Sequence, residues 1–246
     1  LYTFEGDKSP SIRSSSDIND LSTIIVYRDE DGETVDYTLR TEGSEIEAKS
    51  YYEYGGDDTL DVITEYKATG TVNHNESTDL SNWDWLDPVV DTTKPKSKTV
   101  YLADGEKVDY VLSYDESGKA ETRTNYIYVD GSKELIWFTL SYDVEDVSDP
   151  DSDASLNDSL LKSKTIFTGK DVAYVLTLDG LNVTGQSFYI YDGDDLNYIE
   201  QYRAEGTVRT DVAGKDETDE PYDTIEIGAL RTKIQYNSNG QTINYA

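Results

Sequence analysis

Oxygen-bearing side chains are concentrated in one acidic stretch, residues 143–161, which reads DVEDVSDPDSDASLNDSLL. Three aspartates occupy alternate positions there, and an Asn-Asp pair follows closely. Alternate side chains of a loop can turn several oxygens toward one hard cation such as Ca²⁺. The stretch lacks the glycine and the bidentate glutamate of an EF-hand loop, so the alternative is an ordinary solvated loop. If a metal binds at all, the spacing predicts a weak calcium site formed by Asp149, Asp151, Asp153, Asn157 and Asp158.

Two tryptophans in the segment NWDWLDP, Trp83 and Trp85, are the second candidate for binding chemistry. An indole ring can stack on a sugar, or it can pack against a neighbouring part of the same protein. No other residues of a binding cleft surround them in the sequence. We therefore expect packing, and keep a glycan ligand as the alternative.

The sequence contains few of the residues that usually carry out catalysis. The chain has no cysteine, and its one histidine, His74, lies in a segment between the repeats described below. Cysteine nucleophiles and the usual His/Cys zinc sites are thereby excluded, and a Ser-His-Asp triad would depend on His74 alone. With 51 Asp and Glu residues, some pair of carboxylates will show any chosen spacing. We therefore expect no enzymatic activity, no catalytic residue and no cofactor apart from the calcium candidate.

Charge restricts the partners. Twenty-one Lys and Arg against 51 Asp and Glu give a formal net charge of −30 over 246 residues. A surface this acidic repels nucleic acid and anionic membranes. No apolar run approaches the length needed to cross a bilayer as a helix. We therefore expect neither a nucleic-acid partner nor membrane insertion.

The elements that position these residues recur along the chain. The segment GETVDYTL at 32–39 returns as GEKVDYVL at 105–112, as GKDVAYVL at 169–176 and as GQTINYA at 240–246. A Tyr-x-Tyr pair follows each of the first three copies, and a segment such as KSKTV at 96–100 precedes the copies. Landmarks that recur in one order indicate a tandem repeat. The sequence predicts an all-β fold of tandem antiparallel four-stranded meander repeats of about 64–76 residues, stacked or strung into an extended array.

Alternation of side chains predicts the strands and their buried face. In the second copy we expect strands at about 98–103, 107–114, 120–129 and 134–143, joined by tight turns. Val108, Tyr110 and Leu112 alternate, so they share one face of a strand. One four-stranded meander has a single apolar face and little core. We therefore expect a neighbouring repeat to cover that face.

The repeats divide the chain into five parts. Residues 1–20 form the end of a preceding repeat plus a linker, and 21–95, 96–161 and 162–229 are three repeats, each with its acidic linker. Residues 230–246 begin a fourth. The segment LYTFEGDK at 1–8 resembles EYKATGTV at 65–72, so the chain begins and ends inside a repeat. It is either a window of a longer array or a subunit that receives missing strands from another copy by strand complementation.

The segment YIYDGDDLNYIEQYRAEG at 189–206 resembles the tyrosine-aspartate (YD) hairpin repeats of Rhs-type and other large secreted proteins, through Tyr189, Tyr191, Asp192, Gly193, Leu196 and Gly206. The longer pattern is similar to the tandem β-repeats of giant bacterial surface proteins. The resemblance implies an extracellular or cell-surface protein with a structural or adhesive role, forming a stalk, fibre or sheath. Its partners would be neighbouring repeats or copies of itself. The alternatives are a glycan-binding module with tyrosine and tryptophan faces and a YD-type shell around a toxin.

Overall fold

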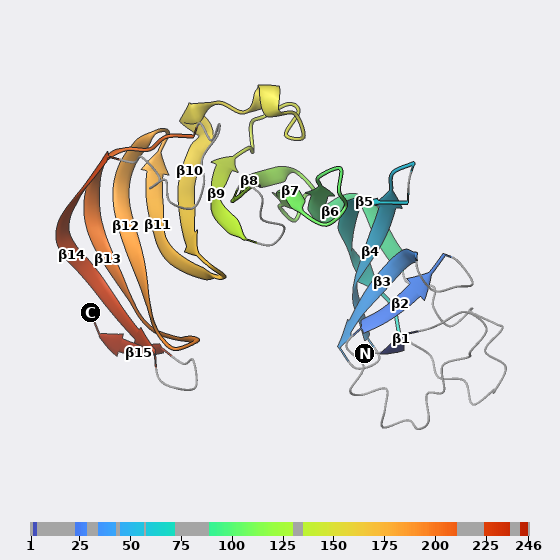
Figure 1. The fold of residues 1–246 in the computed structure, drawn as a ribbon. Coiled ribbons are helices and arrows are strands. Elements are labelled where there is room, and N and C mark those ends of the chain that lie inside the picture. The colour runs from blue at the N-terminus through green and yellow to red at the C-terminus, as the bar shows by residue number, and fades with distance from the viewer. Residues whose placement is uncertain are drawn as a thin grey trace. The chain divides into compact units, whose positions relative to one another are not determined.

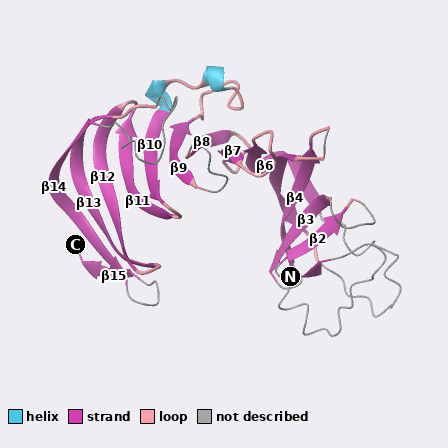
Figure 2. Ribbon diagram, in the orientation of Figure 1, coloured by secondary structure: helices cyan, strands magenta, loops and turns pink. Residues whose placement is uncertain are grey.

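The computed structural model describes residues 2–3, 23–28, 34–42, 45–56, 58–71, 89–129, 135–210, 224–236 and 242–245. Within them the protein is all-β, and its only helices are two short 3₁₀ turns (Figure 2). None of the helices described is long and apolar enough to cross a membrane. The chain divides into two compact units, residues 1–120 and 121–246. This division falls inside the second predicted repeat.

The first unit is a sheet whose strands follow one another in chain order (Figure 1). Each strand from β2 to β7 pairs antiparallel with the next, whereas β1 and β2 are parallel. The strands are β1 (Tyr2–Thr3), β2 (Thr23–Tyr27), β3 (Val35–Glu42), β4 (Glu45–Tyr54), β5 (Leu60–Thr69), β6 (Val89–Tyr101) and β7 (Val108–Tyr114).

The second unit repeats this antiparallel meander (Figure 1). Its strands also pair with their neighbours in chain order. The 3₁₀ turns η2 (Asp153–Ser155) and η3 (Asp158–Leu160) lie between β9 and β10. The strands are β8 (Ala120–Tyr128), β9 (Ile136–Asp143), β10 (Leu161–Thr168), β11 (Asp171–Asp179), β12 (Asn182–Asp192), β13 (Asp195–Thr207), β14 (Thr224–Tyr236) and β15 (Thr242–Tyr245).

The predicted all-β fold of antiparallel strands is confirmed, whereas the four-stranded meander repeat stays a prediction. Strands β7, β8 and β9 lie within two residues of their expected bounds. Strand β6 differs, because it begins at Val89, well inside the predicted linker 73–95. Opposite Tyr66 and Ala68 lie Pro95 and Val90, so residues 91–94 form a bulge against β5. A bulge lets a strand continue through a polar segment that does not keep register with the neighbouring strand. The alternation of side chains alone cannot predict such a continuation.

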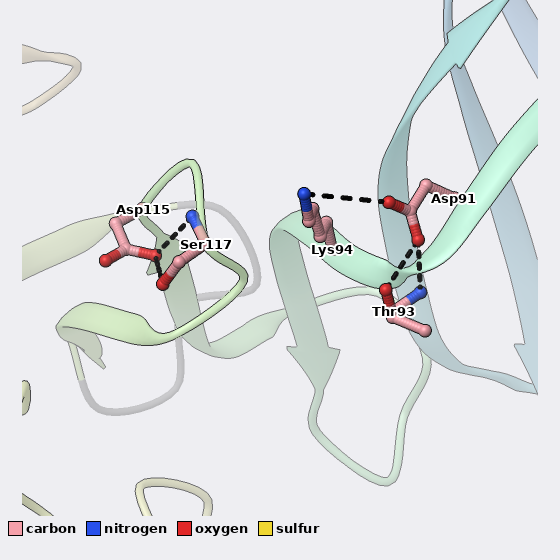
Figure 3. A network of polar contacts seen from close by, with 5 residues as sticks. All are labelled: Asp91, Thr93, Lys94, Asp115 and Ser117. Atoms are coloured by element: carbon pink, nitrogen blue, oxygen red, sulfur yellow. Dashed lines mark hydrogen bonds and ion pairs between the residues drawn. The ribbon is translucent and has the colours of Figure 1, made fainter.

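Side chains hold this bulge together (Figure 3). The Asp91 carboxylate accepts hydrogen bonds from the Thr93 N–H at 3.1 Å and the Thr93 hydroxyl at 2.5 Å, and it pairs with Lys94. The hydroxyl bond is the largest of the effects that lower the pKa of Asp91. The turn after β7 lies against the bulge: a Cβ on Gly118, whose φ is +83°, would lie 2.7 Å from the Thr93 carbonyl oxygen. Glycine is therefore required at 118 for both its conformation and its close approach.

The predicted apolar face of the VDYTL-type strands agrees with the observed burial. Leu39, Leu112 and Leu176 close the three matching segments, and each is 0% exposed. In the first unit Leu39 packs with Ile24, Ile46 and Ala68. Leucine at the end of the alternation therefore marks the most buried point of each segment.

Connecting segments cover part of this face in the second unit. Val144, Leu161 and Val208, which flank the connections after β9 and β13, are 1%, 0% and 3% exposed. The Val208 N–H donates to the Leu181 carbonyl oxygen at 3.0 Å. The predicted linker 143–161 is thus buried at Val144 and Leu161, while residues 145–160 between them are exposed or half-buried. The predicted linker 209–229 contains the start of β14.

Candidate functional site

The most elaborate polar site in the described part of the chain surrounds Arg123 on β8. Its side chain is 1% exposed. The Nε–H donates to Asn125 Oδ1 at 2.9 Å, and Nη1 donates to the carbonyl oxygens of Pro150 and Asp151, both at 3.0 Å. Nη2 donates to the Asp153 carboxylate, whose side chain is 82% exposed. We call this set, Arg123 with Asn125, Pro150, Asp151 and Asp153, the guanidinium clamp.

The guanidinium clamp occupies the loop for which the sequence predicted calcium. Two carbonyl oxygens and one carboxylate converge there on a cation, but the cation is the protein's own guanidinium. The planar fork of arginine suits this role, since it can donate to several acceptors at once. The loop is thereby fastened to the sheet, and three of its oxygens are occupied.

The five predicted calcium ligands do not converge on one point. Asp153 belongs to the guanidinium clamp, while Asn157 Oδ1 accepts from the Ser159 N–H at 3.0 Å and caps η3. The main-chain carbonyl oxygen of Asp149 accepts from the Ser152 N–H, and that of Asp151 accepts from Arg123. Within the described ranges, no three Asp, Glu or His side chains are grouped so that they could hold a metal ion. The calcium site therefore stays a prediction without a supporting geometry.

The other candidates from the sequence cannot be placed. Trp83, Trp85 and His74 lie outside the described residues. Their predicted roles stay predictions.

Aromatic side chains form two matching rows, one in each unit. Ladder 1 consists of Tyr37, Tyr51 and Tyr66 on β3, β4 and β5, with successive ring centroids 6.5 and 5.9 Å apart. Ladder 2 consists of Tyr174, Phe188 and Tyr202 on β11, β12 and β13, with spacings of 5.9 and 5.8 Å. In each ladder the second pair meets edge to face, at 75° and 82°. Such pairs contribute about 0.5–1.5 kcal/mol each beyond the area that they bury.

One polar residue occupies the same place beside each ladder. Lys49 lies opposite Leu39 and Tyr66 across the strands, and Gln186 lies opposite Leu176 and Tyr202. The Lys49 ammonium is 3.7 Å from the centroid of the Tyr37 ring and 4.7 Å from that of Tyr51. A sugar could not stack on those ring faces without displacing this cation. Ladder 1 is therefore arranged for packing within the sheet.

Other cations also cover rings of the same chain. Lys164 on β10 is 2% exposed; its Nζ lies 4.6 Å from the Phe138 ring centroid and donates to the Arg209 carbonyl oxygen at 3.2 Å. Arg28 lies over Tyr54 at 5.0 Å, and Lys233 over Tyr198 at 3.6 Å. Several of the few basic residues of this acidic chain thus stabilise the sheet itself.

A small charged network joins ladder 2 to β14. Glu200 accepts from Lys233 Nζ and from the Tyr202 hydroxyl, both at 2.9 Å. The hydrogen bond from Lys233 is the first cause of the lowered pKa of Glu200, and the same bond raises the pKa of Lys233. Because the pKa of Glu200 is depressed, the stabilisation is present above the ordinary carboxyl pKa and is lost as the pH falls through the lowered value.

Sequence reasoning missed Arg123, Lys164 and Gln186. One signal was present, since Arg123 precedes a Tyr-x-Tyr pair at the position that Lys49 and Gln186 hold before the equivalent aromatic pairs. The acceptors of Arg123 in the loop are 27 to 30 residues away, beyond the reach of local patterns.

Gln186 yields a stability prediction. It is 5% exposed, and its Oε1 has no hydrogen-bond partner among the described residues. Leaving a buried acceptor unpaired costs about 1–3 kcal/mol. Replacing Gln186 with Met, which has similar volume and no such acceptor, should raise the free energy of unfolding by about 1–2 kcal/mol in a urea titration. The matched control is Gln201→Met on the neighbouring strand, which should change little; an unchanged or less stable Gln186→Met would contradict the prediction.

No protein-family model matches the chain, and no curated protein matches its sequence.

Proposed function

We propose that the chain is a non-enzymatic structural or adhesive segment of a repetitive extracellular or cell-surface protein, where it forms part of a stalk, fibre or sheath. Its building unit is the four-stranded meander repeat. Neighbouring repeats, or copies of the chain, are its partners, and it needs no cofactor for this role.

One observation carries the proposal. At the first junction between predicted repeats β1 pairs parallel with β2. At the three later junctions the last strand of one repeat pairs antiparallel with the first strand of the next: β5 with β6, β9 with β10, and β13 with β14. Each of these pairs contains a register shift. A repeat thus extends the sheet of its predecessor by main-chain hydrogen bonds, which do not depend on side-chain identity. Such a junction can be used any number of times.

The side chains support the same interpretation. Side chains of three described sets make their contacts within the chain itself: the rings with a cation over them, the guanidinium clamp and both ladders. They stabilise strands and fasten connections, as a load-carrying or spacing element requires.

Electron microscopy of the purified chain, across a range of pH and salt, tests the proposal. We expect elongated particles, or filaments where copies associate. Compact globular particles under every condition would contradict it. A glycan array run in parallel separates the alternative, since reproducible binding that is lost on replacing Tyr174 and Tyr202 with Leu would favour a glycan-binding module.

A further inference from the structure

The two aromatic ladders differ at their middle position. Ladder 1 consists of three tyrosines, whereas ladder 2 has Phe188 between Tyr174 and Tyr202. The ring centroids of Tyr51 and Tyr66 in ladder 1 are 5.9 Å apart, and the two rings meet edge to face at 75°. Two phenol rings in contact can undergo a reaction that a phenol and a phenyl ring cannot, because only a phenol readily gives up a hydrogen atom to a one-electron oxidant.

We propose that ladder 1 is a site of oxidative cross-linking, at which Tyr51 of β4 becomes joined to Tyr66 of β5 by a carbon–carbon bond. The co-reactant is hydrogen peroxide, acting through a one-electron oxidant such as a haem peroxidase. Each phenol gives up one electron and its hydroxyl proton, and the two phenoxyl radicals form a bond between the ring carbons next to their oxygens. The protons on these two carbons are then lost and the two oxygens are protonated again. One peroxide takes up the two electrons and two protons that are released and becomes two waters.

The sheet holds the two rings side by side for this reaction. Tyr51 lies opposite Thr64 and Lys49 lies opposite Tyr66, so the two tyrosines are diagonal neighbours on one face of the β4–β5 pair. Both side chains are half-buried, which leaves part of each ring open to solvent while the strands limit its motion. Groups held together on one scaffold react at effective concentrations far above those of separate molecules. In dilute solution, coupling within ladder 1 should therefore be faster than coupling between chains.

Tyr37, the third ring of ladder 1, is the less suitable partner for Tyr51. The centroids of these two rings are 6.5 Å apart, and the Lys49 ammonium lies 3.7 Å from the Tyr37 centroid but 4.7 Å from that of Tyr51. A cation over a ring opposes the removal of an electron from it. Burial also raises the pKa of Tyr37, so its phenol keeps its proton. The pair Tyr51–Tyr66 is therefore favoured over the pair Tyr37–Tyr51.

The test is oxidation of the full chain in dilute solution with hydrogen peroxide and a haem peroxidase, followed by digestion and mass spectrometry. Glu53 and Glu65 lie between the two tyrosines, so a protease that cleaves after acidic residues places Tyr51 and Tyr66 on separate peptides. We expect a joined product with the mass of the two peptides less two hydrogen atoms. The fluorescence of dityrosine should accompany it in the monomer fraction.

Single substitutions within and beside the ladders give matched variants. Tyr51→Phe gives ladder 1 the pattern of ladder 2 and should lower the yield of the joined peptide about tenfold or more. Tyr52→Phe should change that yield less than about twofold, because Tyr52 is also half-buried but lies on the opposite face of β4. Phe188→Tyr is the converse change. It completes ladder 2, where the ring at 188 lies 5.8 Å from that of Tyr202 at 82°, and should create a new joined peptide between β12 and β13.

Four results would each overturn the proposal: no joined peptide after oxidation, an equal yield from Tyr51→Phe and the wild type, a product that joins Tyr51 only to Tyr37, or dityrosine only between chains. Circular dichroism should show every variant folded, since each substitution keeps an aromatic ring. The cross-link would tie β4 covalently to β5, which suits a load-carrying element, but its formation does not depend on the proposed function. Its absence would leave the proposed function standing, because that rests on the junctions between repeats.

Discussion

Replacing Arg123 with alanine should lower the free energy of unfolding by about 3–4 kcal/mol, the largest single effect that we expect. The substitution removes a fully buried side chain and donors to four acceptors. The loop oxygens left behind can reach water, because Asp153 is 82% exposed, so the loss comes mainly from packing and from the released loop. Urea titration measures the free energy, and limited proteolysis within residues 144–160 reports the loop.

Two further variants locate the origin of that loss. Asp153→Asn keeps an acceptor but removes the charge opposite a buried guanidinium, so we expect a loss of about 1–2 kcal/mol. Asp149→Asn changes a carboxylate of the same loop whose side chain is outside the guanidinium clamp, and it should stay within about 0.5 kcal/mol. If Arg123→Ala left both stability and proteolysis unchanged, the guanidinium clamp would not fasten the loop.

The sequence predicts strands well where alternation is continuous. The segment from Val108 to Leu112 identifies its own strand, its buried face and its most buried residue. The turns around Gly118 and Gly193 were also predictable, because both residues have positive φ in hairpins where glycine was expected. These features depend on neighbours a few residues apart, which is the distance over which side-chain alternation and turn chemistry act.

Features that depend on distant partners could not be predicted. Asp151 and Asp153 suggested a metal by their spacing alone, whereas the acceptors around Arg123 are provided by a loop that folds back across the sheet. The start of β6 at Val89 was missed for a related reason. A bulge stabilised by Asp91 and Thr93 interrupts the alternation of side chains in β6. Because a linker and a bulged strand have the same composition, the sequence does not distinguish them.

The KSKT segments show that identical residues of a repeated motif can differ in burial at different places in the fold. Lys98 and Lys164 occupy the same place in this motif and lie opposite equivalent leucines, Leu112 and Leu176. Lys164 is 2% exposed, whereas Lys98 is only half-buried. The difference arises from the segment after β13, which provides the Arg209 carbonyl oxygen as an acceptor for Lys164. A repeated motif can therefore predict a strand without predicting the environment of each side chain.

Lys164 is accordingly the second position at which we expect a large effect. Lys164→Ala removes a buried four-carbon stem against Phe138 and leaves the Arg209 carbonyl oxygen without this donor, so the free energy of unfolding should fall by about 2–4 kcal/mol. Lys164→Met keeps the volume and removes the cost of burying a charge. It should stay within about 1 kcal/mol of the wild type, because buried charges contribute little net stability compared with apolar residues of similar shape.

Lys162→Ala is the matched control on the same strand. Its side chain is 51% exposed and pairs with Asp143 at 3.8 Å, so it should lose no more than about 0.5 kcal/mol. An equal, small loss for Lys162→Ala and Lys164→Ala would mean that the segment after β13 does not bury Lys164 in solution. A Met variant as unstable as the Ala variant would instead place the stabilisation in the ammonium, through its hydrogen bond and its contact with the Phe138 ring, and not in the stem. The cover over β10 would then be fastened in the same manner as the loop at Arg123, by a cation that donates to a main-chain oxygen of the connecting segment.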